Sequence, residues 1–216
     1  MNFAIIAQQL VSGMGSSLMI FVLTLLFSMP LGLLVAFGRM SKIKPLQAVI
    51  KVFIAILRGT PLMLQLLVVN FAPYYLFRIS LPRWYRFAAI IIGFSVNYAA
   101  YFAEIYRSGI ESIPKGQYEA ASVLGYNKNQ TFFRIIFPQM VKRVLPPVTN
   151  EVITLVKDTS LAFVLAYEEM FTVAKQIASA RTSIMPLFVA GVFYFIFNAV
   201  VAFAMERIEK KLSYYH

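Results

Sequence analysis

The residues best suited to bind a charged solute lie in an otherwise apolar stretch, residues 144–165. Glu151, Thr154 and Asp158 recur there at intervals of three and four residues, so a helix carries them on one face. An ionisable group in the bilayer interior costs about 2.5 to 3.5 kcal/mol on insertion scales, so we expect that face to point away from lipid. Such a face is suited to line a pathway for a cationic or zwitterionic solute. The alternative is that Lys157 pairs with Asp158 or Glu151 and only neutralises charge.

A second polar stripe is expected in the preceding apolar stretch. Asn97, Tyr101 and Glu104 follow one another at intervals of four and three residues, and Tyr98 adjoins them. We therefore count Asn97 and Tyr98 among the candidates for the solute pathway. Asn97 is equally suited to bond a neighbouring helix. Glu104 is equally suited to pair with Arg107, three residues later.

Arg58 is a third kind of candidate, because it precedes Gly59-Thr60-Pro61 inside another apolar stretch. A proline frees a backbone carbonyl one turn earlier, and a nearby side chain that donates hydrogen bonds would stabilise the break. We count Arg58 among the pathway candidates, because a guanidinium can bind a carboxylate of the solute or of Glu104. Alternatively, its head group snorkels to the membrane surface near Lys51.

Residues 115–138, KGQYEAASVLGYNKNQTFFRIIFP, are too polar to cross a bilayer, although apolar stretches flank them. Apolar side chains recur at helical spacing up to Gly125, where a left-handed C-cap is expected. A second short helix is expected to begin after Asn127 or Asn129 and to stop before Pro138. The segment therefore predicts a compact helix–turn–helix on the membrane surface.

Part of this segment resembles the EAA loop of the permease subunits of bacterial ABC importers. In that family the loop is the coupling helix, which docks into a groove on the cytoplasmic ATPase. The resemblance makes six residues candidates for ATPase coupling: Glu119, Ala120, Ala121, Gly125, Ile135 and Pro138. The small residues suit close approach to a partner, and Glu119 suits an ion pair across the interface. The alternative is an amphipathic surface helix without a partner.

Two further motifs are similar to the branch of that family that carries polar amino acids, the histidine, arginine and glutamine permeases. They are Arg58-Gly59-Thr60-Pro61 and Lys157-Asp158-Thr159-Ser160-Leu161. Phe137 stands where the family most often has Leu, which is a hydrophobic exchange. The resemblance implies an all-α integral membrane protein with the type I ABC importer permease fold.

The resemblance also implies partners: ATP-binding cassette ATPase subunits, a second permease that is identical or a paralogue, and an extracytoplasmic substrate-binding protein. No G-x-x-x-x-G-K-[ST] motif occurs, so ATP and magnesium are expected on the ATPase and no cofactor in this chain. We expect no enzyme, no catalytic residues and no metal site. Nucleic acid is not an expected partner, because the basic residues are divided among short segments between apolar stretches.

The composition excludes an ordinary soluble domain. The chain has 216 residues, 60% of them hydrophobic, a net charge of +11 and a mean hydropathy of +0.72. About 20 apolar residues cross a bilayer, and we expect one domain, residues 1–216, with the coupling loop at 107–143. The predicted spans are 16–37, 52–77, 87–106, 144–165 and 186–205.

The charge distribution predicts the orientation in the membrane. Of 20 Lys and Arg residues, 13 fall in the segments predicted to be cytoplasmic, 5 in the outer ones and 2 within spans. The bias favours a multi-pass protein of the bacterial cell membrane with its N-terminus outside and its C-terminus inside. Arg78, Arg83 and Arg86, three charges in one short outer loop, run against it. The single histidine, His216, is the last residue.

Together these features predict the transmembrane permease subunit of an ATP-driven importer of polar, basic amino acids. One alternative is a membrane anchor that holds a peripheral enzyme through the same loop and transports nothing. A small channel, which needs no nucleotide partner, is another. A third is an ABC importer permease for a different small solute. The acidic stripe argues against the anchor, because an anchor needs no polar pathway.

Overall fold

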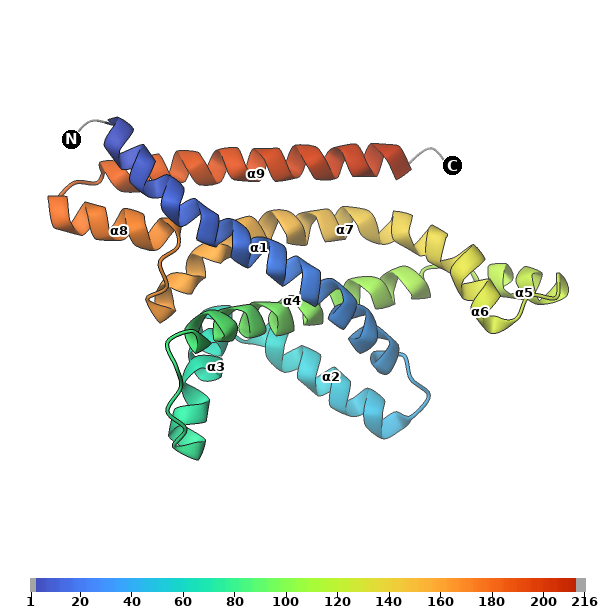
Figure 1. Ribbon diagram of the computed structural model, residues 1–216. Helices are drawn as coiled ribbons and strands as arrows, with labels where there is room; N and C mark the ends of the chain where they lie inside the picture. The colour runs from blue at the N-terminus through green and yellow to red at the C-terminus, as the bar shows by residue number, and fades with distance from the viewer. Residues whose placement is uncertain (1–2, 213–216) are drawn as a thin grey trace.

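A computed structural model describes residues 3–212, and within that range every regular element is a helix (Figure 1). His216 lies outside the described residues. In chain order the elements are α1 (Phe3–Arg39), α2 (Lys44–Gly59), α3 (Leu62–Phe77), α4 (Tyr85–Glu111), α5 (Lys115–Val123), α6 (Lys128–Thr131), the π-helix η1 (Phe132–Ile136), α7 (Phe137–Asp158), the 3-10 helix η2 (Thr159–Leu165), α8 (Met170–Arg181) and α9 (Met185–Leu212).

The long helices run along one axis and give the molecule two distinct ends. In Figure 1, α4, α7 and α9 lie along that axis, and α1 crosses them obliquely. One end, here the loop end, carries α5 and α6. The opposite end, here the α8 end, carries α8 together with the beginnings of α1 and α9. Helix α3 projects sideways from the bundle near the α8 end.

The helices match the predicted spans only in part. Three segments are long and apolar enough to cross a membrane: Ile6–Arg39, Tyr85–Glu111 and Met185–Leu212. The predicted span 52–77 is wrong as a single helix, because α2 and α3 meet there at an angle of 111°. Counting that bent pair as one span gives up to four. Residues 144–165 form the later part of α7 and η2, which are not among the helices long and apolar enough to cross a membrane. The count of five spans therefore stays a prediction.

Helix α4 is the centre of the bundle. Of its most apolar stretch of 18 residues, 61% is buried inside the protein, compared with 28% for the corresponding stretch of α1 and 17% for that of α9. Its aromatic residues Phe94, Tyr98 and Phe102 are among the largest fully or almost fully buried side chains. Side chains of α4 therefore face several neighbours at once, whereas α1 and α9 leave much apolar surface for lipid.

Small side chains bring α1 close to α4. Thr24 and Ser28 are completely buried one turn apart on α1, and Gly32 continues that face. Ser17 is also completely buried, but it contacts Glu169 and Met170 at the start of α8. Interfaces between membrane helices are enriched in such residues, because they let two backbones approach. A Cβ atom at Gly32 would lie 2.7 Å from the Cβ of Phe102. The two helices can therefore approach this closely only because residue 32 has no side chain.

Two glycines of α1 test this interface with opposite expected signs. Alanine in place of Gly15, which has open space around it, should raise the free energy of unfolding by about 0.5 to 1 kcal/mol through helix propensity. Gly32→Ala should lower it by about 1 to 3 kcal/mol, because the added methyl group overlaps Phe102. The measurement is the unfolding midpoint of each variant in one detergent. Equal stabilisation by both substitutions would contradict the close approach.

Candidate functional site

The predicted polar faces of α4 and α7 meet. The Tyr98 hydroxyl donates a hydrogen bond of 2.8 Å to Oδ2 of Asp158. Tyr98 is only 2% exposed, and Asp158 is half-buried. One carboxylate of the acidic stripe is thus held by a tyrosine from the central helix. Thr154, from the same stripe, is exposed.

A cavity of about 500 Å³ lies on the loop-end side of that hydrogen bond and is lined mainly by charged and polar side chains. The Arg58 guanidinium lies 5.1 Å from the centre of the Tyr101 ring, a cation–π contact. Glu151 lines the same cavity, whereas Asp158 does not. Its lining residues are Arg58, Tyr101, Glu104, Ile105, Arg107, Ser108, Gly109, Ser112, Arg143, Pro147 and Glu151.

Glu104 belongs to an ion-pair cluster at the edge of the cavity. Its carboxylate lies 2.7 Å from Nη2 of Arg107, and Nε of Arg39 at the end of α1 lies 3.7 Å away. Arg107 also reaches Glu111 at 2.5 Å. These contacts agree with the ion-pair alternative for Glu104. They tie the ends of α1 and α4 together and leave Glu151 as the acid on the opposite, α7 wall of the cavity.

The break between α2 and α3 is stabilised by two amide side chains. The Leu57 carbonyl accepts hydrogen bonds from Nδ2 of Asn97 at 3.1 Å and from Nε2 of Gln65 at 2.9 Å. Asn97 also donates to Oε1 of Gln65 at 3.0 Å. These amides supply the donors that the bend before Pro61 requires. Asn97 is buried by these contacts and does not line the cavity.

Glu169 is a buried ionisable residue that sequence reasoning did not single out. It is completely buried at the start of α8, where its carboxylate accepts hydrogen bonds from the backbone N–H groups of Phe171 and Thr172 at 2.7 and 2.6 Å. The Tyr194 hydroxyl of α9 donates another at 3.0 Å. Burial raises the pKa of the Glu169 carboxyl, and these hydrogen bonds oppose the rise. Glutamate is not among the residue types preferred at an N-cap, so no sequence pattern marks Glu169 as the cap of α8.

The first helix of the predicted coupling loop, α5, is terminated at Gly125 as predicted. Its φ is 76°, the left-handed value that glycine adopts without strain. The Tyr126 N–H donates to the Ala121 carbonyl and the Gly125 N–H to the Ser122 carbonyl, each at 3.0 Å. This pair of bonds is the Schellman motif. Ala121 is only 1% exposed, so it packs within the loop and does not face a partner.

The second half of the loop differs from the prediction. Asn127 caps α6, with reciprocal hydrogen bonds between Asn127 and Gln130 at 2.9 and 3.0 Å. The predicted stop before Pro138 is wrong, because α6, η1 and α7 follow one another without a gap. Pro138 lies in the first turn of α7, where a missing N–H is tolerated. The wider π-turn before it has the Phe137 N–H bonded to the Phe132 carbonyl.

The tip of the loop exposes apolar side chains. Val123 is 88% and Leu124 73% exposed, directly before Gly125, and Phe133 in η1 is 66% exposed. Of the remaining coupling candidates, Glu119, Ala120 and Pro138 are exposed and Ile135 is partly buried. An apolar tip on a polar loop is a feature of surfaces that bind other proteins.

Known membrane transport proteins resemble this chain over most of its length. A family model described as "Binding-protein-dependent transport system inner membrane component" matches residues 28–214. The L-cystine transport system permease protein of Bacillus subtilis is 37% identical, over 90% of this chain and 82% of its own length. The arginine transport system permease protein of the same organism is 30% identical, over 94% and 92%. A putative glutamine transport system permease protein of Rickettsia felis is 34% identical, over 88% and 87%.

Solved structures share the fold over almost the whole chain. The crystal structure of an amino acid ABC transporter with histidines contains a chain that superposes with a TM-score of 0.86 at 28% identity, covering 98% of this chain and 99% of that one. A chain of the inward-facing MetNI methionine ABC transporter superposes with a TM-score of 0.78 at 19% identity, over 99% and 100%. The second likeness is one of fold alone.

Adjacent glutamates at the start of α8 provide a stability test. Glu169→Ala should lower the free energy of unfolding by about 2 to 4 kcal/mol, because it removes an N-cap and leaves buried donors unpaired. Glu168→Ala, at an exposed position, should change it by less than about 0.5 kcal/mol. The measurement is detergent-based thermal unfolding of both variants. A similar effect at the two positions would show that the buried carboxylate does not hold α8.

Proposed function

The chain belongs to the binding-protein-dependent transport system inner membrane components, and from this premise we propose that it is the permease subunit of an ATP-driven importer of polar amino acids, with a preference for basic ones. Relatives named for cystine, glutamine and arginine transport support the amino acid assignment. The structural likeness to an amino acid ABC transporter supports it as well. The preference for basic amino acids rests on the acidic groups of α7.

The proposed assembly contains chains besides this one. Two copies of the chain, or one copy and a paralogue, form the pathway about a two-fold axis, as is common for assemblies of similar subunits. ATPase subunits bind ATP and magnesium at the loop end, and this chain carries no cofactor and catalyses no reaction. An extracytoplasmic binding protein delivers the amino acid at the α8 end. The protein crosses the cell membrane five times, with its N-terminus outside and its C-terminus in the cytoplasm.

Coupling to the ATPase rests on the shape of the loop. Its fold is fixed by the cap at Gly125 and the capping box at Asn127, so it moves as a unit. Its exposed apolar tip, Val123 and Leu124, fits a hydrophobic groove, and Glu119 beside it is free to meet a basic group. This rigid, apolar tip is the observation that carries the coupling proposal.

The helical path from the loop into the membrane supplies the mechanism. Helices α6, η1 and α7 continue from Lys128 to Asp158 without a gap, so α7 joins the loop directly to the acidic face. Closure of an ATPase dimer displaces the loop, and α7 carries Glu151 and Asp158 with it. To move a two-state equilibrium from 1:99 to 99:1 takes about 5.5 kcal/mol of differential binding, which ATP binding supplies in this scheme.

The cavity suits a solute that carries both a negative and a positive group. Arg58 on one wall fits the carboxylate that all amino acids carry, since a guanidinium binds carboxylates through two parallel hydrogen bonds. Glu151 on the α7 wall fits an ammonium or guanidinium group at the other end of the solute. Because Arg107 and Arg39 already pair with Glu104, Glu151 is the acid with capacity for the solute.

Coupling is tested at Gly125. The chain is purified in mild detergent from its native membrane, and co-purification with an ATPase and magnesium-dependent ATP hydrolysis are measured. Gly125→Val should lose most of both, because a β-branched residue is strained at a φ of 76°. Gly125→Asn is the matched control and should retain them, since asparagine tolerates the left-handed region. Purification of the wild-type chain without any ATPase would refute the importer assignment.

Substrate preference is tested at Glu151. In proteoliposomes that contain the complete transporter, Glu151→Gln should reduce arginine or lysine uptake about tenfold and change glutamine uptake much less, since it removes a charge that only the basic substrates need. Asp158→Asn should have a smaller selective effect, because Asp158 is held by Tyr98 and does not line the cavity. Equal loss of arginine and glutamine uptake in Glu151→Gln would contradict the charge preference.

A further inference from the structure

One charged surface is not accounted for by the proposed pathway or by the coupling loop. Arg78 and Arg83 lie between α3 and α4 and Arg86 in the first turn of α4, at the end of the molecule opposite to the loop, and all three are exposed. The positive-inside bias places that end outside the cell. Arginines in a short outer loop oppose this orientation, so their presence there is not explained by topology.

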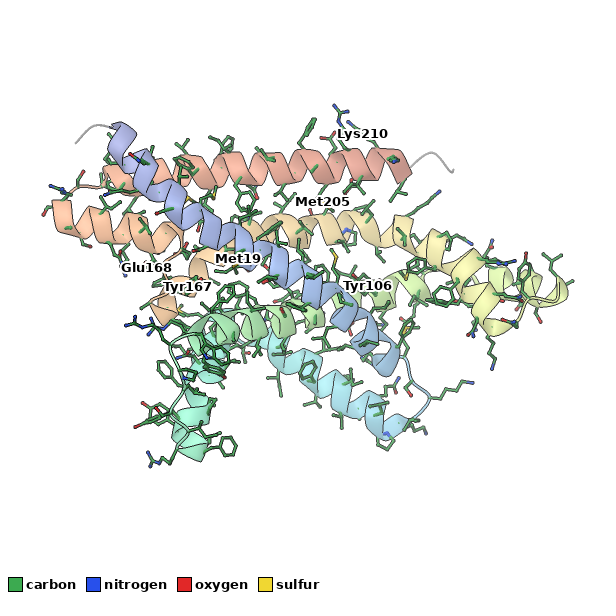
Figure 2. The ribbon with its side chains drawn as sticks, viewed as in Figure 1. Met19, Tyr106, Tyr167, Glu168, Met205 and Lys210 are labelled. Atoms are coloured by element: carbon green, nitrogen blue, oxygen red, sulfur yellow. The ribbon has the colours of Figure 1, made fainter. Side chains whose placement is uncertain are left out.

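Two of these arginines line a surface pocket of about 770 Å³ at the α8 end. One wall is formed by Arg83 and Trp84, directly before α4, and by Arg86 in its first turn, and the other is the segment that follows η2. Figure 2 shows Tyr167 and Glu168 of that second wall close to α8. The pocket is lined by Ser16, Arg83, Trp84, Arg86, Phe87, Ala166, Tyr167 and Glu168, and we call it the Arg83–Glu168 pocket.

The two walls are fixed to each other. The rings of Phe87 and Tyr167 stack with their centres 5.5 Å apart and an angle of 27° between their planes. Nη1 of Arg86 donates a hydrogen bond of 3.2 Å to the Ala166 carbonyl. Arg83 and Trp84 therefore stand on a braced support, and Trp84 is 69% exposed. A rigid support lowers the entropy lost when a partner binds.

The charge around the pocket is positive. The segments at this end that are predicted to lie outside carry five basic residues, Arg78, Arg83, Arg86, Lys175 and Arg181, and all are exposed. They carry two acids, but Glu169 is completely buried as the cap of α8. Glu168 is then the one exposed acid of residues 78–86 and 166–184 in the described structure. A partner for this surface is expected to be acidic.

We propose that the Arg83–Glu168 pocket is the docking surface for an acidic surface loop of the extracytoplasmic binding protein. This inference rests on the proposed function for the partner and for the orientation. Arginine, tryptophan and tyrosine are the residue types that carry most of the binding energy in protein interfaces, and the pocket presents them together. The Arg83 fork binds an incoming carboxylate, and Trp84 packs against the apolar part of the partner's loop.

The lining favours a protein over the other acidic partners. Glu168 on the rim repels a lipid phosphate, whereas a protein surface can offer a basic group to Glu168 and an acidic one to Arg83. A second copy of the chain that met this patch about a two-fold axis would set arginines against arginines. The binding protein meets both conditions if acidic groups surround a basic one on its docking face.

Photocrosslinking in intact cells of the native organism tests the proposal. A benzophenone amino acid replaces Trp84 in one chain and Ile184, which is 66% exposed between α8 and α9, in the control chain. The adducts are identified by mass spectrometry. An adduct between position 84 and an extracytoplasmic amino-acid-binding protein, absent from position 184, is the expected result. A lipid adduct, an adduct with a second copy of the chain or no adduct at position 84 overturns the proposal.

Charge reversal provides the second measurement. In the chain labelled at position 84, Arg83→Glu should lower the yield of the binding-protein adduct about tenfold or more, because the reversed charge repels an acidic loop. Arg181→Glu, which makes the same change in charge outside the pocket, should leave the yield within about twofold. Equal loss in both variants overturns a specific role for Arg83.

The same preparation separates this proposal from the proposed function. Co-purification of an ATPase reports on the importer assignment, and the adduct at position 84 reports on docking. An ATPase without the adduct refutes the docking surface alone. An adduct without an ATPase supports docking and refutes the importer assignment.

Discussion

A helix broken inside a membrane must find donors for its freed carbonyl groups, and the cavity depends on how this chain does so. The Leu57 carbonyl takes its donors from Asn97 and Gln65, which join α2, α3 and α4. That junction turns the chain by 111° and leaves Arg58, the next residue, over the ring of Tyr101. An isolated break would leave backbone groups unsatisfied at a cost of several kcal/mol each. The polar residues of α4 thus serve the architecture first and the cavity second.

The loop end and the cavity are linked by one continuous helical path. A proline in the middle of a helix removes a hydrogen bond and crowds the carbonyl four residues earlier. The π-turn at Phe132–Ile136 widens the helix just before Pro138, which then occupies the first turn of α7. The path therefore changes direction without ending. The loop at one end and Glu151 at the other are joined by continuous helix, in which Pro146 and Pro147 each remove one backbone hydrogen bond.

Most local features were predictable from the sequence, apart from the helix stop expected before Pro138, and long-range ones were not. The cap at Gly125, the Asn127 cap and the ion pair of Glu104 with Arg107 join residues no more than five apart, so propensity and spacing suffice. The bend of residues 52–77 depends on Asn97, which lies 40 residues from its partner Leu57. Pairing of Tyr98 with Asp158 spans 60 residues. Hydropathy reports how apolar a stretch is, but not whether a distant amide will support a break in it.

Glu169 shows why charge counts along the chain misjudge a surface. In a count of charges it offsets one arginine of the same end. Its carboxylate, however, is buried and accepts hydrogen bonds from the N-terminus of α8 and from Tyr194. The exposed surface is therefore more basic than the sequence of that end suggests. In the proposed orientation this basic surface lies outside and is costly for membrane insertion, since arginines there oppose the orientation that the basic residues of the opposite end favour. The excess is tolerated because the bias over the whole chain is large, and recognition of an acidic partner gives a reason to keep it.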